Sequence, residues 1–228
     1  GIIGATAVED YNNNVIKIHE KTIEQREQLF TEYIDTVGFN AEPVLLTYPK
    51  NNTLENLFSI IMKERSEYEF STTDRISHFL WLIDDTEHIA TIEQEFSESD
   101  SLYIADGHHR SASSALLAKD YPNPDASQKH FMSCLIPEKD LKIYEFYRLI
   151  KDLNGLSKKE FLIQLDEIFT IENCGSHPRK LKQQHHFSMY LDGEFYTLHL
   201  RSKFSVFENA LEALDTQILY KLVLKPIL

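Results

Sequence analysis

Residues 102–117 decide the fold of this chain and read Leu102-Tyr103-Ile104-Ala105-Asp106-Gly107-His108-His109-Arg110-Ser111-Ala112-Ser113-Ser114-Ala115-Leu116-Leu117. The apolar residues 102–105 predict a buried strand. The small residues after position 111 recur with Leu116 at helical spacing, so they predict a helix that packs closely against a sheet. The stretch therefore predicts a strand, a sharp turn and a helix.

The turn carries one acid, one glycine, two imidazoles and one guanidinium in consecutive positions. Gly107 permits a positive φ and a close approach of a ligand to the backbone. The free N–H groups and the positive dipole at the start of the helix favour an anion, and the planar fork of Arg110 suits two phosphate oxygens. The expected phosphate-binding residues are Gly107, His109, Arg110 and Ser111. The expected catalytic residues, either of which can accept a proton from an acceptor hydroxyl, are Asp106 and His108.

Two other interpretations of the turn stay open. A helix N-terminus with solvated polar residues needs no ligand at all. A metal site is favoured less, because consecutive residues on a helix point about 100° apart and rarely bind one ion together. We therefore expect no metal ion bound by the protein at this turn.

The sequence Asp106-Gly107-His108-His109-Arg110 resembles the DGHHR signature of the bacterial and archaeal domain-of-unknown-function family 1015. Further blocks similar to that family lie at residues 15–22, 78–81, 152–157 and 222–228, so the resemblance covers most of the chain. Family members extend beyond this chain at both ends, which implies that it is a fragment of a longer protein.

That family in turn resembles the ParB/sulfiredoxin-like superfamily, in which the equivalent turn binds the phosphates of ATP, ADP or CTP. The resemblance implies a nucleotide, ADP or ATP or alternatively CTP, bound together with Mg²⁺. His108 stands where sulfiredoxins carry the catalytic cysteine, which argues against sulfinic-acid repair. Free serine kinases of the superfamily carry Asp-Gly-His-Thr-Arg, which differs only at His109. A nucleotide-dependent small-molecule phosphotransferase is the implied function; the alternatives are a ParB-like nucleotide-dependent switch and a non-enzymatic partner-binding domain.

Composition sets further bounds. The formal net charge of −13 over 228 residues argues against direct nucleic-acid binding, which depends on Lys and Arg. The sequence contains no run of about 20 apolar residues, so it predicts no membrane-spanning helix. Cys134 and Cys174 form no metal-type or redox-type motif and predict reduced thiols of a cytoplasmic protein. We expect one domain over residues 1–228, with a second lobe from about residue 152 as the alternative.

Three segments before the turn bear on the site. Apolar and polar residues alternate over residues 15–20, which predicts a strand. This strand either brings His19 to the edge of the site or leaves the His19 ring hydrogen-bonded to the backbone. Residues 76–83 predict a strand, residues 84–97 a helix, and residues 102–105 the next strand in parallel. This crossover would bring Asp84 and Asp85 toward Asp106, although both residues also suit a helix cap.

The remaining pattern completes an α/β or α+β fold with a mixed sheet. Thr22–Gln25 reads as a capping box for a helix that ends at Gly38, and a second capping box lies at 157–160. Residues 43–48 predict a strand, and residues 51–53 cap the helix after it. Hairpins are expected for 131–136 with 141–150, and for 187–191 with 194–200 around Asp192-Gly193. Residues 215–224 predict a final helix.

Overall fold

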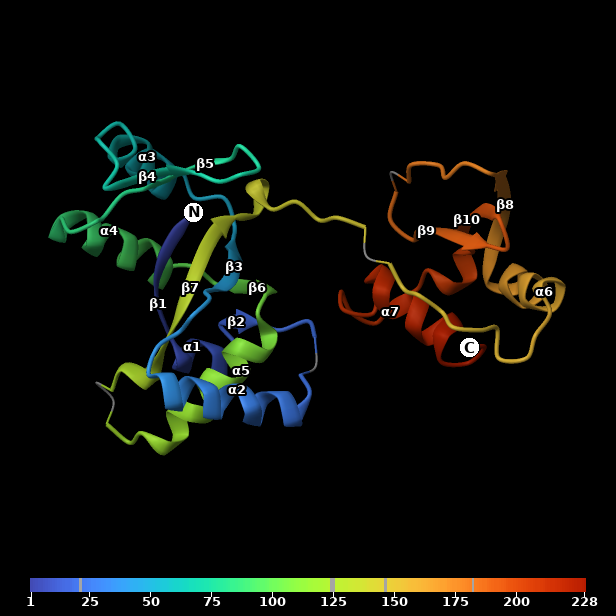
Figure 1. The fold of residues 1–228 in the computed structure, drawn as a ribbon, viewed down its shortest axis with the longest axis horizontal. Helices are drawn as coiled ribbons and strands as arrows, with labels where there is room; N and C mark the ends of the chain where they lie inside the picture. The colour runs from blue at the N-terminus through green and yellow to red at the C-terminus, as the bar shows by residue number, and fades with distance from the viewer. Residues whose placement is uncertain (21, 124–125, 146, 182) are drawn as a thin grey trace. The chain divides into compact units, whose positions relative to one another are not determined.

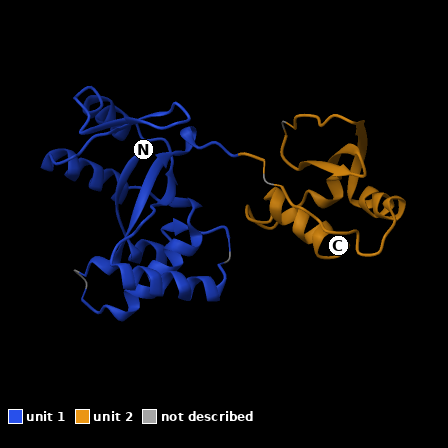
Figure 2. Cartoon of the chain, viewed as in Figure 1, with its two compact units in different colours: residues 1–143 blue, residues 144–228 orange. Residues whose placement is uncertain are grey.

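The computed structural model describes residues 1–20, 22–123, 126–145, 147–181 and 183–228. Its contacts divide the chain into two compact units, residues Gly1–Ile143 and Tyr144–Leu228, which are coloured separately in Figure 2. The boundary thus lies a few residues before position 152, where the sequence allowed a second lobe to begin. Each unit has its own apolar core.

Unit 1 is built on a five-stranded sheet in the order β1-β7-β3-β6-β2 (Figure 1). Strand β7 is antiparallel to β1 and parallel to β3, whereas β6 is antiparallel to β3 and parallel to β2. The sheet is therefore mixed, as the sequence predicts. Its strands are β1 (Ile2–Ala7), β2 (Ile16–Lys17), β3 (Val44–Tyr48), β6 (Leu102–Asp106) and β7 (His130–Pro137).

Helix α5 (His108–Leu117) packs on this sheet through the small residues of the 102–117 stretch. Ala112 and Ala115 are buried, and Ala115 joins a core that contains Leu46, Ile104 and Phe131. Small side chains let the helix approach the strands closely, which matches the prediction. The other α-helices among the described residues of unit 1 are α1 (Val8–Asn12), α2 (Glu24–Val37), α3 (Asn52–Ile61) and α4 (Thr86–Ser97).

The expected crossover from residues 76–83 to β6 is wrong. Strand β5 (Ser77–Leu80) pairs with β4 (Tyr68–Ser71) in a separate two-stranded sheet whose residues are exposed. The turn between them is closed by a hydrogen bond from Thr72 N to Ile76 O and has Arg75 at φ 66°. A local partner closes only a short loop, so β5 pairs with β4 and not with the main sheet.

The expected pairing of residues 131–136 with 141–150 is also wrong. Both edges of β7 are occupied, one by β1 and the other by β3. The described residues of 141–150 therefore carry no strand and are largely exposed, and position 146 lies outside the described residues. Strand β1, for which the sequence analysis predicted no element, takes the place expected for 141–150.

Unit 2 has a three-stranded antiparallel sheet in the order β8-β10-β9. The predicted hairpin is confirmed, with Asp192 and Gly193 at φ 51° and 81° in the turn. The predicted capping box is confirmed as well, since Ser157 and Glu160 form it at the start of α6. The elements are α6 (Lys158–Ile168), β8 (Phe169–Gly175), β9 (His186–Leu191), β10 (Glu194–Leu200) and α7 (Asp215–Leu219), after which residues 220–224 continue as a π-helical turn.

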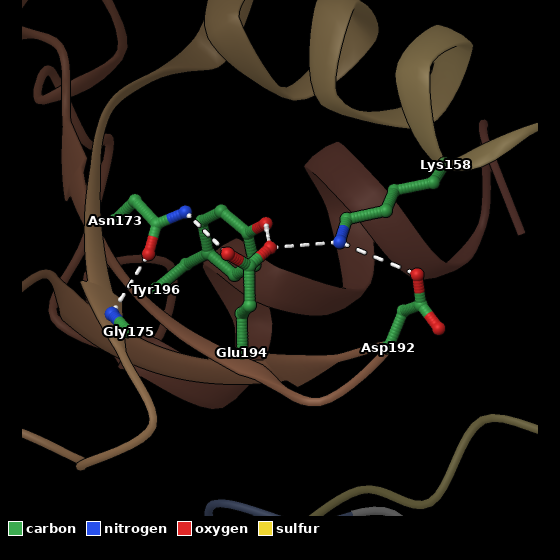
Figure 3. A network of polar contacts seen from close by, with 6 residues as sticks. All are labelled: Lys158, Asn173, Gly175, Asp192, Glu194 and Tyr196. Atoms are coloured by element: carbon green, nitrogen blue, oxygen red, sulfur yellow. Dashed lines mark hydrogen bonds and ion pairs between the residues drawn. The ribbon is translucent and has the colours of Figure 1, made fainter.

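A polar network links helix α6 to the β9–β10 hairpin (Figure 3). Glu194 Oε2 accepts hydrogen bonds from Lys158 Nζ at 2.8 Å and from Tyr196 Oη at 2.6 Å. Glu194 Oε1 accepts a third from Asn173 Nδ2 at 3.2 Å. Lys158 also lies 3.4 Å from Asp192 Oδ2. The Glu194 carboxylate thus accepts from three donors and links the start of α6 to the sheet of unit 2.

Within the described ranges, none of the helices combines the length and the apolar character that a membrane span requires. Cys134 in β7 and Cys174 in β8 both carry free thiols.

Candidate functional site at the turn between strand β6 and helix α5

A strand-to-helix turn is confirmed, but it is tighter than the turn expected over residues 106–110, because His108, His109 and Arg110 already lie in the first turn of the helix. Strand β6 ends at Asp106, Gly107 adopts the left-handed conformation with φ 97° and ψ 27°, and α5 begins at His108. A Cβ atom on residue 107 would lie 3.3 Å from both Cα and Cγ1 of Val44 in β3. Glycine is required here for its positive φ and for this close approach to the neighbouring strand.

Arg110 lies across the mouth of the turn. Its Nη2 atom is 2.6 Å from Asp106 Oδ2, and its Nη1 atom donates to the carbonyl oxygen of Pro43 and lies 3.6 Å from Glu42 Oε2. The Arg110 side chain is 25% exposed and that of Asp106 is 70% exposed. The guanidinium is thus held in place by protein oxygens, and part of the side chain remains exposed.

His108 is buried at the start of α5, with 6% of its surface exposed. Its Nε2 atom is buried and has no hydrogen-bond partner among the described residues. The ring of His19 meets it edge to face, with centroids 4.4 Å apart. Burial, and secondarily the neighbouring His19, lower the pKa of His108 below its usual value, so the ring is neutral at pH 7. The contact between the two rings places His19 at the turn.

His109 joins the turn to helix α2. Its Nε2 atom accepts a hydrogen bond from the backbone N–H of Ile23 at 3.2 Å, which requires an unprotonated Nε2. The capping box expected from Thr22 is wrong, because the N-cap residue is Ile23, one position later. The Thr22 hydroxyl donates instead to the Glu27 carboxylate.

Helices α2 and α5 run parallel with their N-termini at the same end (Figure 1). After the Ile23–His109 contact, Ser113 Oγ donates to Glu27 O at 3.0 Å, one turn further along each helix. Tyr121, just beyond α5, donates to Asp35 near the end of α2 at 2.7 Å. Two helix N-termini therefore meet at the turn. No local sequence pattern predicts this meeting, because it joins segments that are distant in the chain.

Ser111 is buried and turned into the helix. Its hydroxyl donates to the carbonyl oxygens of Gly107 and His108 at 3.1 and 3.2 Å. Its backbone N–H makes the first intrahelical hydrogen bond of α5, to Gly107 O at 3.0 Å. Both donors of Ser111 are thus used within the helix. The backbone N–H groups of residues 108–110 precede this first hydrogen bond, so the helix does not use them as donors.

Asp84 and Asp85 follow β5, which is absent from the main sheet, so the topological reason for placing them beside Asp106 is lost. Asp85 caps α4 by accepting from Glu87 N and His88 N at 2.9 and 3.0 Å. Of the two interpretations of this pair, the structure favours the helix cap for Asp85.

Three groups of the site escaped the sequence analysis: the Pro43 carbonyl, the Glu42 carboxylate and the Ile23 amide. Two of them are backbone groups, which carry no side-chain signal. Two hollows lie away from the turn, one of about 660 Å³ beside α6 and one of about 100 Å³ between the C-terminal parts of α2 and α5. Among the described residues, no group of three or more His, Cys, Asp or Glu side chains is arranged to hold a metal ion.

Comparison with known proteins adds the family. Residues 1–217 match the family described as "Protein of unknown function (DUF1015)". Comparisons with curated proteins and with solved structures found no match. Because the match spans both units and includes the 102–117 stretch, the chain belongs to this family.

Proposed function

We propose that the turn between β6 and α5 binds the phosphate groups of a nucleotide, ADP or ATP or alternatively CTP, and that the protein transfers phosphate to a small molecule. The observation that carries this proposal is the meeting of two parallel helix N-termini, α2 and α5, joined by the hydrogen bond from Ile23 N to His109 Nε2.

Each N-terminus supplies donors that the helix itself does not use. In α5 the first intrahelical bond is made by Ser111 N, so the amides of residues 108–110 precede it. In α2 the first such bond is made by Arg26 N, so the amides of residues 24 and 25 precede it. Free N–H groups and two aligned dipoles together attract an anion more strongly than either helix alone.

Arg110 supplies the charge. An incoming phosphate competes with Asp106 for the Nη2 atom, while the contact with the Pro43 carbonyl keeps the guanidinium in place. This exchange releases the Asp106 carboxylate, which then accepts the proton of an acceptor hydroxyl. The same ion pair thus holds both groups ready in the free protein.

His108 supplies a second proton-transfer group. Its buried, neutral ring has an Nε2 atom without a partner among the described residues, and such an atom costs free energy until a ligand bonds to it. Mg²⁺ would enter with the nucleotide, bound by phosphate oxygens and water.

The test is a thermal-unfolding screen of the protein against inorganic phosphate, pyrophosphate, ADP, ATP and CTP, with and without Mg²⁺. A ligand at about 100 times its Kd stabilises the folded state by about 2.7 kcal/mol. We expect stabilisation by at least one nucleotide, and its loss in Arg110→Ala but not in the exposed control Arg65→Ala. The proposal would be refuted if none of these phosphate compounds raised the unfolding temperature.

A second candidate is a partner-binding module without enzymatic activity. The observation that favours it is the exposed β4–β5 hairpin, on which Tyr68, Phe70, Phe79 and Leu80 are each about half exposed or more. Loss of a binding partner on substitution of Phe70 and Phe79, together with silence in the nucleotide screen, would support this second function.

A further inference from the structure

A pair of imidazoles lies on the β9–β10 hairpin of unit 2, outside the turn described above. His186 in β9 and His199 in β10 are direct cross-strand partners. The next pair is hydrogen-bonded, since Leu200 N donates to His185 O at 3.1 Å. His186 and His199 therefore form a non-hydrogen-bonded pair, the type in which side chains on antiparallel strands approach most closely.

The two rings turn nitrogen atoms toward each other. His186 Nε2 lies 3.2 Å from His199 Nδ1, and the ring centroids are 4.2 Å apart at an interplanar angle of 81°. Two adjacent nitrogen ligands at about 2.0–2.1 Å from one ion are about 2.9 Å apart in a square-planar site and about 3.3 Å apart in a tetrahedral site. The pair is thus already at the separation of two ligands that share one metal ion.

A second pair lies beside the first. Asp215, the first residue of α7, accepts from His185 N at 2.9 Å, and its Oδ1 atom lies 3.0 Å from His185 Nδ1. His185 has φ 62°, an uncommon conformation for a residue with a side chain. Asp215 holds this conformation and places a carboxylate in the same cluster of partly buried residues.

We propose that His186 and His199 together bind one divalent transition-metal ion of the class that prefers imidazole, namely Cu²⁺, Ni²⁺ or Zn²⁺. The described residues supply no ready set of three ligands, so water completes the coordination of the ion. Three segments of unit 2, residues 185–186, residue 199 and the start of α7, meet at this point, and a metal ion there would fasten the open end of the hairpin. The simpler alternative is a hydrogen bond between two imidazoles that binds no metal.

The experiment is a titration of the full, metal-free chain with Cu²⁺, followed by calorimetry and by electron paramagnetic resonance. We expect one high-affinity equivalent whose spectrum shows splitting from nitrogen ligands. His186→Gln and His199→Gln should each weaken this binding at least tenfold. Glutamine retains hydrogen-bonding groups without an imidazole, so it separates metal binding from the hydrogen bond.

Two controls locate the site. His177→Gln removes an exposed imidazole of the same unit and should leave binding unchanged. The double variant His19→Gln/His109→Gln removes imidazoles at the turn of unit 1 and should also retain the equivalent. Absence of nitrogen splitting in the wild-type spectrum would overturn the proposal, as would equal Cu²⁺ affinity in the wild type and in folded His186 and His199 variants.

Discussion

Asp106 and Arg110 form an ion pair across the turn that starts α5, with Oδ2 and Nη2 2.6 Å apart. Because the carboxylate is largely exposed, the pair contributes little to stability. Its consequence is geometric: it orients the guanidinium at the meeting point of two helix N-termini.

Replacing Arg110 by Lys tests the guanidinium itself. Lysine keeps the charge but cannot contact Asp106 and the Pro43 carbonyl with two nitrogen atoms at once. We expect the affinity for the stabilising nucleotide to fall by about 1–3 kcal/mol, with the fold intact. Calorimetric titration of both proteins measures this difference, and equal affinities would contradict a phosphate site at Arg110.

Replacing Asp106 by Asn separates binding from catalysis. The amide removes a negative charge that competes with phosphate for Arg110, so nucleotide affinity should stay the same or rise. Phosphate transfer should fall by about 10²–10⁴-fold, the contribution of a positioned general base, because an amide cannot accept the proton of a hydroxyl. Affinity and turnover, measured side by side, check this expectation; a large loss of affinity would show that Asp106 supports the bound state.

Gly107→Ala tests the backbone of the turn. A methyl group meets Val44 at 3.3 Å in a conformation with φ 97°, so we expect a loss of at least about 1–2 kcal/mol in the free energy of unfolding. The matched control is Gly4→Ala in β1, where a Cβ atom meets nothing within 4 Å. Urea unfolding compares the two variants, and equal stabilities would rule out the steric argument.

His108 should make stability depend on pH. Burial and His19 lower its pKa in the folded state below 6.5, so the unfolded chain binds the proton more readily. The stabilisation is fully present above about pH 6.5 and is lost as the pH falls through the lower, folded pKa. We expect the free energy of unfolding to fall more steeply between pH 7.5 and about 5 in the wild type than in His108→Asn. Parallel slopes would indicate that this ring does not titrate as described.

Glu194 should make the stability of unit 2 depend on pH in a more acidic range than His108 does for unit 1. Hydrogen bonds from Lys158, Tyr196 and Asn173 lower its pKa from 4.5 to about 2. The carboxylate therefore stabilises unit 2 above about pH 4.5, and this contribution disappears as the pH falls toward 2. Glu194→Gln should be less stable at pH 7 and show a flatter acid dependence. Tyr196→Phe, which removes one of the three donors (Figure 3), should fall between the two in acid-unfolding curves.

The sequence by itself determined the elements whose causes are local. Gly107 between an apolar run and a run of small residues was sufficient to predict β6, its turn and α5. Likewise, the Ser157–Glu160 capping box and the Asp192-Gly193 turn each satisfy their own backbone groups within a few residues. Such features depend on φ preferences and short-range hydrogen bonds, which neighbouring residues specify.

Only the tertiary structure decided which distant segments meet. The pattern of residues 76–83 predicts a strand but not the strand with which it pairs. In the structure β5 pairs with β4 in a local hairpin and is not part of the main sheet. Strand β1 occupies the edge of β7 that residues 141–150 were expected to fill. The same holds at the site, where the Ile23 amide and the Pro43 carbonyl reach His109 and Arg110 from other elements. Pairing between strands and parallel packing of α2 on α5 depend on competition among all exposed edges and apolar faces of the chain, and no single segment encodes the outcome of that competition.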